Sequence, residues 1–143
     1  MRACAVVFAR EPVAGEVKTR LARAIGDEEA AGVYAAILEH TIEQVTTSGA
    51  RVILSLADVP SGRWLREITV PIEIQRGEAL GDRMYDAFER RFAEGETRVV
   101  VVGSDCPWLK ASHVALATAK LGGADVVLGP ADDGGYWLVA QEA

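Results

Sequence analysis

The sequence contains little cysteine, and its two cysteines stand far apart. Cys4 and Cys106 are the only ones in 143 residues, and no Cys-x-x-Cys pair occurs. These counts exclude a disulfide framework and a cysteine-based metal site. Unpaired thiols are typical of a reducing compartment, so we expect a cytoplasmic protein.

Long apolar runs are also absent. The apolar stretch from Met1 to Ala9 is too short for the hydrophobic region of a secretory signal, and it leads directly into Arg10 and Glu11. No run approaches the ~20 apolar residues of a membrane span. We therefore expect no membrane partner.

Positive charge is scarce as well. Lys and Arg number 15 against 21 Asp and Glu, which gives a net charge of −6. Proteins that bind nucleic acid generally use a basic face to displace counterions, so we expect no nucleic-acid partner. A small anionic ligand held by a few local cations stays open.

Six segments have strand-like patterns. Four are continuous apolar runs, one is a short alternating segment, and one lies near the C-terminus. In that order they are residues 4–9, 52–57, 99–102, 125–128, 72–74 and 136–140. Continuous hydrophobicity is typical of strands buried on both faces of a parallel sheet, whereas the alternating segment fits a position nearer an edge.

Helical patterns lie between these strands. Apolar residues recur at three- and four-residue steps over residues 27–47, 80–93 and 112–121. Strands alternating with helices predict an α/β fold, a three-layer sandwich with helices on both faces of a mostly parallel sheet. We find no repeat or linker and expect one domain over residues 1–143.

The segments that follow the strands are polar and rich in glycine. Residues 10–23, 103–107 and 129–135 each follow an apolar strand. In an open parallel sheet, ligands bind beyond the carboxyl ends of the strands, and all three segments fall at that predicted edge. This arrangement is the strongest functional signal in the sequence.

Segment 10–23 resembles a loop that could bind phosphate. Gly15 would let the backbone approach a ligand, while Lys18 and Arg20 would donate to phosphate oxygens. Neither the Walker pattern nor the dinucleotide fingerprint G-x-G-x-x-G is present. The alternative is that Lys18, Arg20 and Arg23 are solvated surface charges.

Acidic residues follow two other strands. Asp105 after residues 99–102 could share Mg²⁺ with the phosphates of a nucleotide, or it could start a turn or cap a helix. Asp132 and Asp133, followed by Gly134 and Gly135, form either a tight turn or a second acidic group.

Residues 75–84 lead into a predicted helix, where a glycine-rich loop can bind an anion or the edge of a base. We favour a structural role for Asp82, and a substrate role for Gly77 and Gly81 stays open. Cys106 has no predicted base beside it, so we expect no nucleophilic role. Trp64, Trp108 and Trp137 are too scattered in sequence to predict a stacking platform.

Together these motifs resemble a known family. The ordered set is Phe8-Ala9-Arg10-Glu11-Pro12, Gly15, Lys18-Thr19-Arg20-Leu21, Gly81-x-Arg83-Met84, Gly103-Ser104-Asp105-Cys106-Pro107 and Gly129-Pro130-x-x-Asp133-Gly134-Gly135-Tyr136. It is similar to small bacterial transferases with a GT-A-like nucleotide-diphosphosugar fold, labelled radical-SAM/selenodomain-associated or arsenosugar-biosynthesis glycosyltransferases. It is similar, more distantly, to phospholactate and molybdenum-cofactor guanylyltransferases. The match runs from Met1 to about Val139.

The resemblance implies roles for particular residues. Those implied to bind the nucleotide and its phosphates are Arg10, Gly15, Lys18, Thr19, Arg20, Gly77 and Gly81. Those implied on the acceptor side are Asp132, Asp133, Gly134, Gly135 and Tyr136. Asp105 would hold Mg²⁺ or Mn²⁺, and Asp105, Asp133 and Lys18 would be catalytic.

Several chemistries follow from the resemblance. The first is glycosyl transfer from a nucleotide-sugar to a small-molecule acceptor, and the second is nucleotidyl transfer to a phosphorylated small molecule. Ser104-Asp105-Cys106 has one carboxylate where many sugar transferases have Asp-x-Asp, so both glycosyl and nucleotidyl transfer stay open. Family members usually continue about fifty residues beyond Tyr136. A third expectation is therefore a truncated, non-catalytic binding domain whose edge at Tyr136 to Val139 favours self-association as a homo-oligomer.

Overall fold

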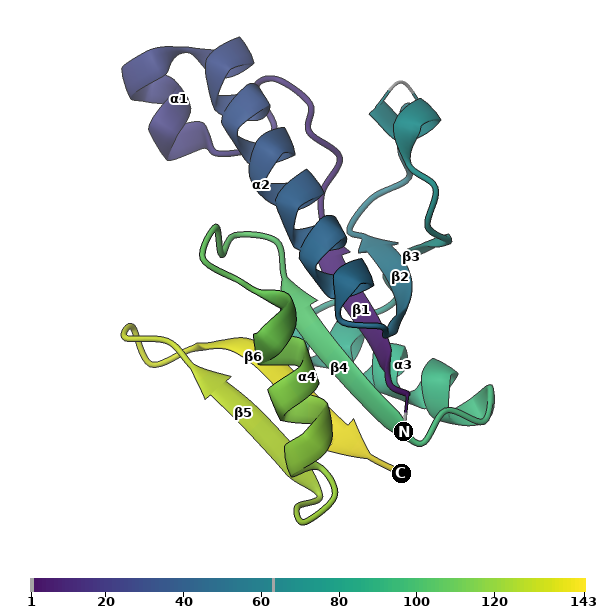
Figure 1. Ribbon diagram of the computed structural model, residues 1–143. Helices are drawn as coiled ribbons and strands as arrows, with labels where there is room; N and C mark the ends of the chain where they lie inside the picture. The colour runs from purple at the N-terminus through teal and green to yellow at the C-terminus, as the bar shows by residue number, and fades with distance from the viewer. Residues whose placement is uncertain (1, 63) are drawn as a thin grey trace.

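A six-stranded sheet forms the centre of the protein, described here by a computed structural model covering residues 2–62 and 64–143 (Figure 1). The strand order is β3-β2-β1-β4-β6-β5. The strands are β1 (Cys4–Ala9), β2 (Arg51–Leu56), β3 (Ile72–Ile74), β4 (Arg98–Gly103), β5 (Val126–Pro130) and β6 (Tyr136–Glu142). Strands β1 to β4 run parallel, and β6 runs antiparallel to both of its neighbours.

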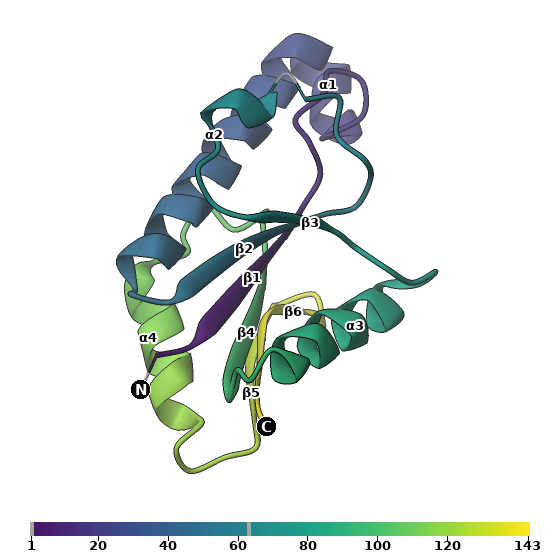
Figure 2. The ribbon, with the colours of Figure 1, turned by 90° about the vertical axis from the view of Figure 1, so that its right-hand side faces the viewer.

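Helices cover both faces of this sheet. They are α1 (Thr19–Ile25), α2 (Asp27–Thr47), α3 (Leu80–Ala93) and α4 (Ala111–Lys120), with a short 3₁₀ helix η1 (Trp64–Glu67) after β2. Helices α2 and α4 pack on one face and α3 on the other (Figure 2). The predicted three-layer α/β sandwich with a mostly parallel sheet is confirmed.

The core explains the continuous apolar runs of the central strands. Val7 and Val100 belong to the cluster on the side of α2 and α4, whereas Val6 and Val101 belong to the cluster with Phe88 of α3. Successive side chains of a strand point to opposite faces, so covering both faces requires every position to be apolar.

Strand register brings the polar loops together. Ala9 at the end of β1 pairs with Leu56 of β2, and Phe8 pairs with Gly103 of β4. The chain therefore leaves β1, β2 and β4 at adjacent points on one edge. This is the edge at which the sequence predicts a ligand site.

Three expectations about local structure are wrong. Segment 10–23 is not one loop, because α1 begins at Thr19; this helix has seven residues and buries none of them, so it leaves no apolar period. Residues Tyr136 to Val139 are not at an edge, because β6 lies between β4 and β5. The edge strand on that side is β5. Its Val126 and Leu128 are 48% and 46% exposed, so residues 125–128 are not buried on both faces as their apolar run predicts.

Across the described residues, none of the helices has both the length and the apolar character that crossing a membrane requires.

Candidate functional site

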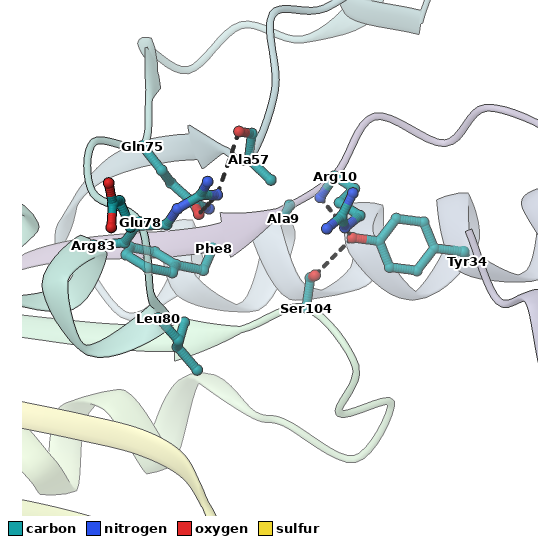
Figure 3. Close-up of a pocket in the computed structure, with 10 residues that line it drawn as sticks. All are labelled: Phe8, Ala9, Arg10, Tyr34, Ala57, Gln75, Glu78, Leu80, Arg83 and Ser104. Carbon is teal, nitrogen blue, oxygen red and sulfur yellow. Dashed lines mark hydrogen bonds between the residues drawn. The ribbon is translucent and has the colours of Figure 1, made fainter. Parts of the chain in front are cut away.

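A cavity of about 480 Å³ lies at the carboxyl ends of β1 to β4 (Figure 3). Its walls come from the ends of the strands, from α2 and from the start of α3. The lining residues are Phe8, Ala9, Arg10, Tyr34, Ala57, Gln75, Glu78, Leu80, Arg83 and Ser104. It is open to solvent and contains charged, amide and apolar side chains, so it suits a ligand with both polar and flat apolar parts.

Tyr34 of α2 holds two walls of the cavity together. Its hydroxyl accepts a hydrogen bond from the Arg10 amide at 3.0 Å and shares another with the Ser104 hydroxyl at 2.8 Å. Tyr34 and Ser104 are both buried. The hydroxyl thus joins the chain after β1 to the chain after β4. The sequence does not reveal this role, because Tyr34 stands in the apolar stripe of its helix.

Arg83 of α3 organises the opposite wall. Its Nε donates to the Gly77 carbonyl at 2.9 Å, and its Nη1 lies 3.2 Å from Gln75 Oε1 and 3.4 Å from the Ala57 carbonyl. One guanidinium therefore links the loops that follow β2 and β3. Gly77 has a φ of 130°, which a residue with a side chain rarely adopts.

Lys18 and Asp105 meet next to this cavity. The Lys18 ammonium forms an ion pair with Asp105 Oδ1, and Asp105 directly follows the cavity residue Ser104. Lys18 has a φ of 51°, and among the described residues it is the only one other than glycine with positive φ. Left-handed backbone at a non-glycine residue is costly and concentrates at functional sites.

The remaining cations of the first segment differ in their surroundings. Arg10 lines the cavity and pairs with Asp58 at 3.2 Å. Thr19 and Arg20 lie exposed in the first turn of α1, and Gly15, with a φ of 86°, forms a turn before that helix. The structure thus brings Lys18 and Arg10 to the cavity side and leaves Arg20 in solvent.

At the start of α3, Asp82 has a structural role and Gly81 lies outside the cavity lining. The Asp82 carboxylate accepts a hydrogen bond from the Ala79 amide at 3.2 Å, which is the structural role that we favoured. Gly81 is in the first turn of α3 and outside the cavity lining.

Residues 131–135 form the tight turn between β5 and β6. Asp133 Oδ1 accepts from the Gly135 amide at 3.0 Å, and the Ala131 amide donates to the Gly135 carbonyl at 2.8 Å. In the described part of the chain, no hydrogen bond or ion pair joins Asp132 or Asp133 to Lys18 or Asp105. Tyr136, which begins β6, is 57% exposed. An acceptor role for this segment stays a prediction.

A metal ion at this site would need oxygen atoms from a bound nucleotide in addition to the Asp105 carboxylate. Within the described residues, no group of three or more His, Cys, Asp or Glu side chains could hold a metal. Asp105 presents one carboxylate, and its side chain is 69% exposed. Because Mg²⁺ commonly takes one or two carboxylates together with phosphate oxygens and water, Asp105 fits a metal that arrives with a nucleotide.

Cys106 follows Asp105 but is not an activated thiol. Burial raises its pKa above the ordinary value of 9.0, and the Asp105 carboxylate raises it further. A thiol in these surroundings stays protonated at neutral pH. That Cys106 has no nucleophilic role stays a prediction.

The tryptophans are not all scattered, as their sequence positions had suggested. The rings of Trp108 and Trp137 contact edge to face with centroids 4.7 Å apart, and His113 lies 5.3 Å from Trp137. Residues distant in sequence meet here because β6 pairs with β4, which precedes Trp108.

Solved structures show which class of fold this is. A cytidylyltransferase from Leptospira borgpetersenii matches with a TM-score of 0.62 and 15% identity, over 99% of this chain and 60% of that one. A CMP:2-keto-3-deoxy-manno-octonic acid synthetase complexed with CTP matches with a TM-score of 0.59 and 15% identity, over 90% and 52%. At these identities the likeness concerns the fold.

A more similar structure comes from Desulfovibrio desulfuricans G20, described as a "putative nucleotide-diphospho-sugar transferase". It has a TM-score of 0.91 and 30% identity, and the match covers 99% of this chain but 64% of that one. The protein thus has the fold of nucleotide-diphospho-sugar transferases and spans less than two thirds of this relative.

The family is shown by the sequence itself. Residues 41–143 match the family described as "Uncharacterized protein conserved in bacteria (DUF2064)", and the chain belongs to it. No curated protein matches the chain significantly. The superfamily expected from the motifs is therefore supported, while the narrower glycosyltransferase family is not tested.

Proposed function

We propose that this protein is a metal-dependent transferase that uses a nucleotide-activated donor, most simply a glycosyltransferase acting on a small-molecule acceptor. The observation that carries the proposal is the position of the Lys18–Asp105 pair beside the cavity at the carboxyl ends of β1 to β4. The fold supports it, because ligands of open parallel sheets bind at this edge.

Different residues of the chain would bind the nucleoside and the phosphates of the donor. The cavity would hold the nucleoside, and Arg10 would face its phosphates together with Lys18. The Lys18 ammonium would move from Asp105 to the diphosphate and stabilise the charge that grows there as the donor bond breaks. Gly77 would keep its loop close to the nucleoside.

Asp105 would hold Mg²⁺ or Mn²⁺ together with the phosphates. When bound, such an ion acts as a Lewis acid that neutralises charge on the leaving diphosphate. Asp133 would act on the acceptor side, where Tyr136 is exposed.

Nucleotidyl transfer is the second candidate, and one observation favours it. The loop after β4 carries Asp105 between Ser104 and Cys106, so it offers one carboxylate rather than an Asp-x-Asp pair. In this reaction an acceptor phosphate attacks the α-phosphate and pyrophosphate leaves. The same cations and the same carboxylate would serve both reactions.

The first test is thermal stabilisation by nucleoside triphosphates and nucleotide-sugars, with and without Mg²⁺ or Mn²⁺. We expect one nucleotide class to raise the Tm only with metal, and Asp105→Ala to lose this shift. Asp125→Ala is the matched control, because Asp125 precedes β5 and so lies at the end of the sheet away from the carboxyl ends of β1 to β4. No shift with any nucleotide would overturn the proposal.

The released product separates the two reactions. Glycosyl transfer releases a nucleoside diphosphate, whereas nucleotidyl transfer releases pyrophosphate. Binding without release of either product, over a panel of sugar and phosphorylated acceptors, would indicate a binding domain and contradict both.

A further inference from the structure

We propose that the cavity selects guanine and that Glu78 is the residue that determines this specificity. The inference rests on the proposed function, since it names the base of the nucleotide that the transferase would use. It is carried by the two chemically different ends of the cavity and by the hydrogen bonds that its other polar residues already make.

Both ends of the cavity carry charged side chains, but only one has an uncovered apolar surface (Figure 3). Phe8, Leu80 and Glu78 lie together at one end, and Arg10 lies at the other with Tyr34 and Ser104. Leu80 is 65% exposed although it lines the cavity, so it offers an uncovered apolar surface. A flat base suits the end with Phe8 and Leu80, and phosphates suit the end with Arg10 and the neighbouring Lys18.

The amide of Gln75 and the guanidinium of Arg83, at the end with Phe8 and Leu80, already form hydrogen bonds. Gln75 Nε2 donates to the Ser55 carbonyl at 2.9 Å, while Gln75 Oε1 accepts from Arg83. Arg83 also holds the Gly77 and Ala57 carbonyls. These groups build the wall of the cavity. A base could form hydrogen bonds with them only if the bonds that they already make were broken.

Glu78 is in a different position. Glu78 is exposed and lines the cavity two residues before Leu80. Among the residues that the structure describes, none forms a hydrogen bond or ion pair with its carboxylate. An ionised carboxylate only accepts hydrogen bonds and can accept two side by side. Its best partner is therefore a ligand edge with two adjacent donors.

Among the common bases, guanine alone has such an edge. Its N1–H and N2–H₂ point the same way, so a carboxylate can accept both. Cytosine and adenine each place a ring acceptor beside their amino donor, and uracil flanks its one N–H with two carbonyls. A bidentate contact of this kind discriminates strongly between bases.

The test is calorimetric binding of GDP, IDP, UDP, CDP and ADP with Mg²⁺ to the wild-type protein and to Glu78→Gln. IDP lacks only the 2-amino group, so it should bind several-fold more weakly than GDP. We expect GDP to bind tightest and Glu78→Gln to weaken it by roughly tenfold or more, because the glutamine amide would oppose a base donor. The preference for GDP over IDP should vanish.

Glu39→Gln, a change at an exposed glutamate of α2, is the matched control and should bind as the wild type does. If UDP, CDP or ADP binds tightest, the guanine inference is overturned while the transferase proposal stands. If Glu78→Gln weakens all five equally, Glu78 contacts the ribose and the inference is overturned as well. If no diphosphate binds, the proposed function fails with it.

Discussion

Lys18 and Asp105 are 87 residues apart in the sequence, yet their side chains form an ion pair between the segment after β1 and the loop after β4. The Lys18 side chain is 27% exposed and that of Asp105 is 69% exposed. Exposed ion pairs contribute only about 0–1 kcal/mol to folding. The left-handed backbone of Lys18 is thus not explained by stability and is consistent with a role in binding.

The strain at Lys18 can be measured by comparing two substitutions. Lys18→Gly and Lys18→Ala both remove the ammonium, but only alanine keeps a Cβ at a φ of 51°. We expect Lys18→Gly to be more stable than Lys18→Ala by about 1 kcal/mol, measured by urea unfolding. Both should weaken nucleotide binding equally. Higher stability of the alanine variant would contradict the strain.

Loss of the Tyr34 hydroxyl should loosen the cavity. Tyr34→Phe leaves the Ser104 hydroxyl and the Arg10 amide without their partner, since both bond to Tyr34. Unsatisfied buried polar groups cost about 1–3 kcal/mol, so we expect a loss of that size in the free energy of unfolding. Tyr85→Phe, at a side chain that is 68% exposed, is the control and should change it by less than about 0.5 kcal/mol.

Two glycines near α3 should respond in opposite ways to alanine. At Gly77, a Cβ would lie 2.8 Å from the Asp82 Cβ and 3.0 Å from the Arg83 amide nitrogen, at a φ of 130°. Gly77→Ala should therefore cost more than about 1 kcal/mol. At Gly81 nothing lies within 4 Å, and Gly81→Ala should stabilise the helix by up to about 1 kcal/mol. Thermal unfolding of both variants checks this, and equal effects would contradict it.

Glu11 should make stability depend on acidic pH. Burial alone would raise the pKa of this carboxyl, but hydrogen bonds from the Ser61 hydroxyl and from the Ser61 and Gly62 amides bring it below its ordinary value of 4.5. A carboxyl whose pKa is lowered by folding stabilises the protein above its unfolded pKa and loses that contribution as the pH falls.

The measurement compares the Tm of the wild type and of Glu11→Gln. The wild type should be more stable at pH 7, and its advantage should shrink as the pH falls through 4.5 and below. Ser61→Ala, which removes the hydroxyl donor at 2.7 Å, should reduce the pH dependence. An advantage that grows towards low pH would contradict this.

The sheet and the main helices could be read from the residues. Residues 4–9 and 27–47 coincide with β1 and α2, because burial on both faces or on one stripe leaves a period in the sequence. Helix α1 could not be read in this way, since it buries none of its residues. A helix that contributes nothing to the core has no apolar pattern to detect.

The sequence predicted the edge of the sheet at which the cavity lies, but not the contacts within the cavity. It named Lys18 and Asp105 separately as candidates, because polar residues after buried strands mark the carboxyl edge, and the structure brings the two into an ion pair. The sequence did not indicate the hydrogen bonds of Tyr34 and Arg83 or the position of Glu78 in the cavity wall. In each case the helix or loop in which the residue stands already explains its residue type, so the local sequence does not mark it as part of a cavity.

The sequence by itself determined the class of fold, the apolar character of the central strands β1, β2 and β4 and the edge that carries the polar loops, since these follow from periodicity and composition. Only the tertiary structure decided which side chains meet. The Tyr34 hydroxyl reaches Ser104, 70 residues away, and Trp108 contacts Trp137. Such contacts depend on strand register and helix placement, which no local pattern encodes because they result from the packing of the whole chain.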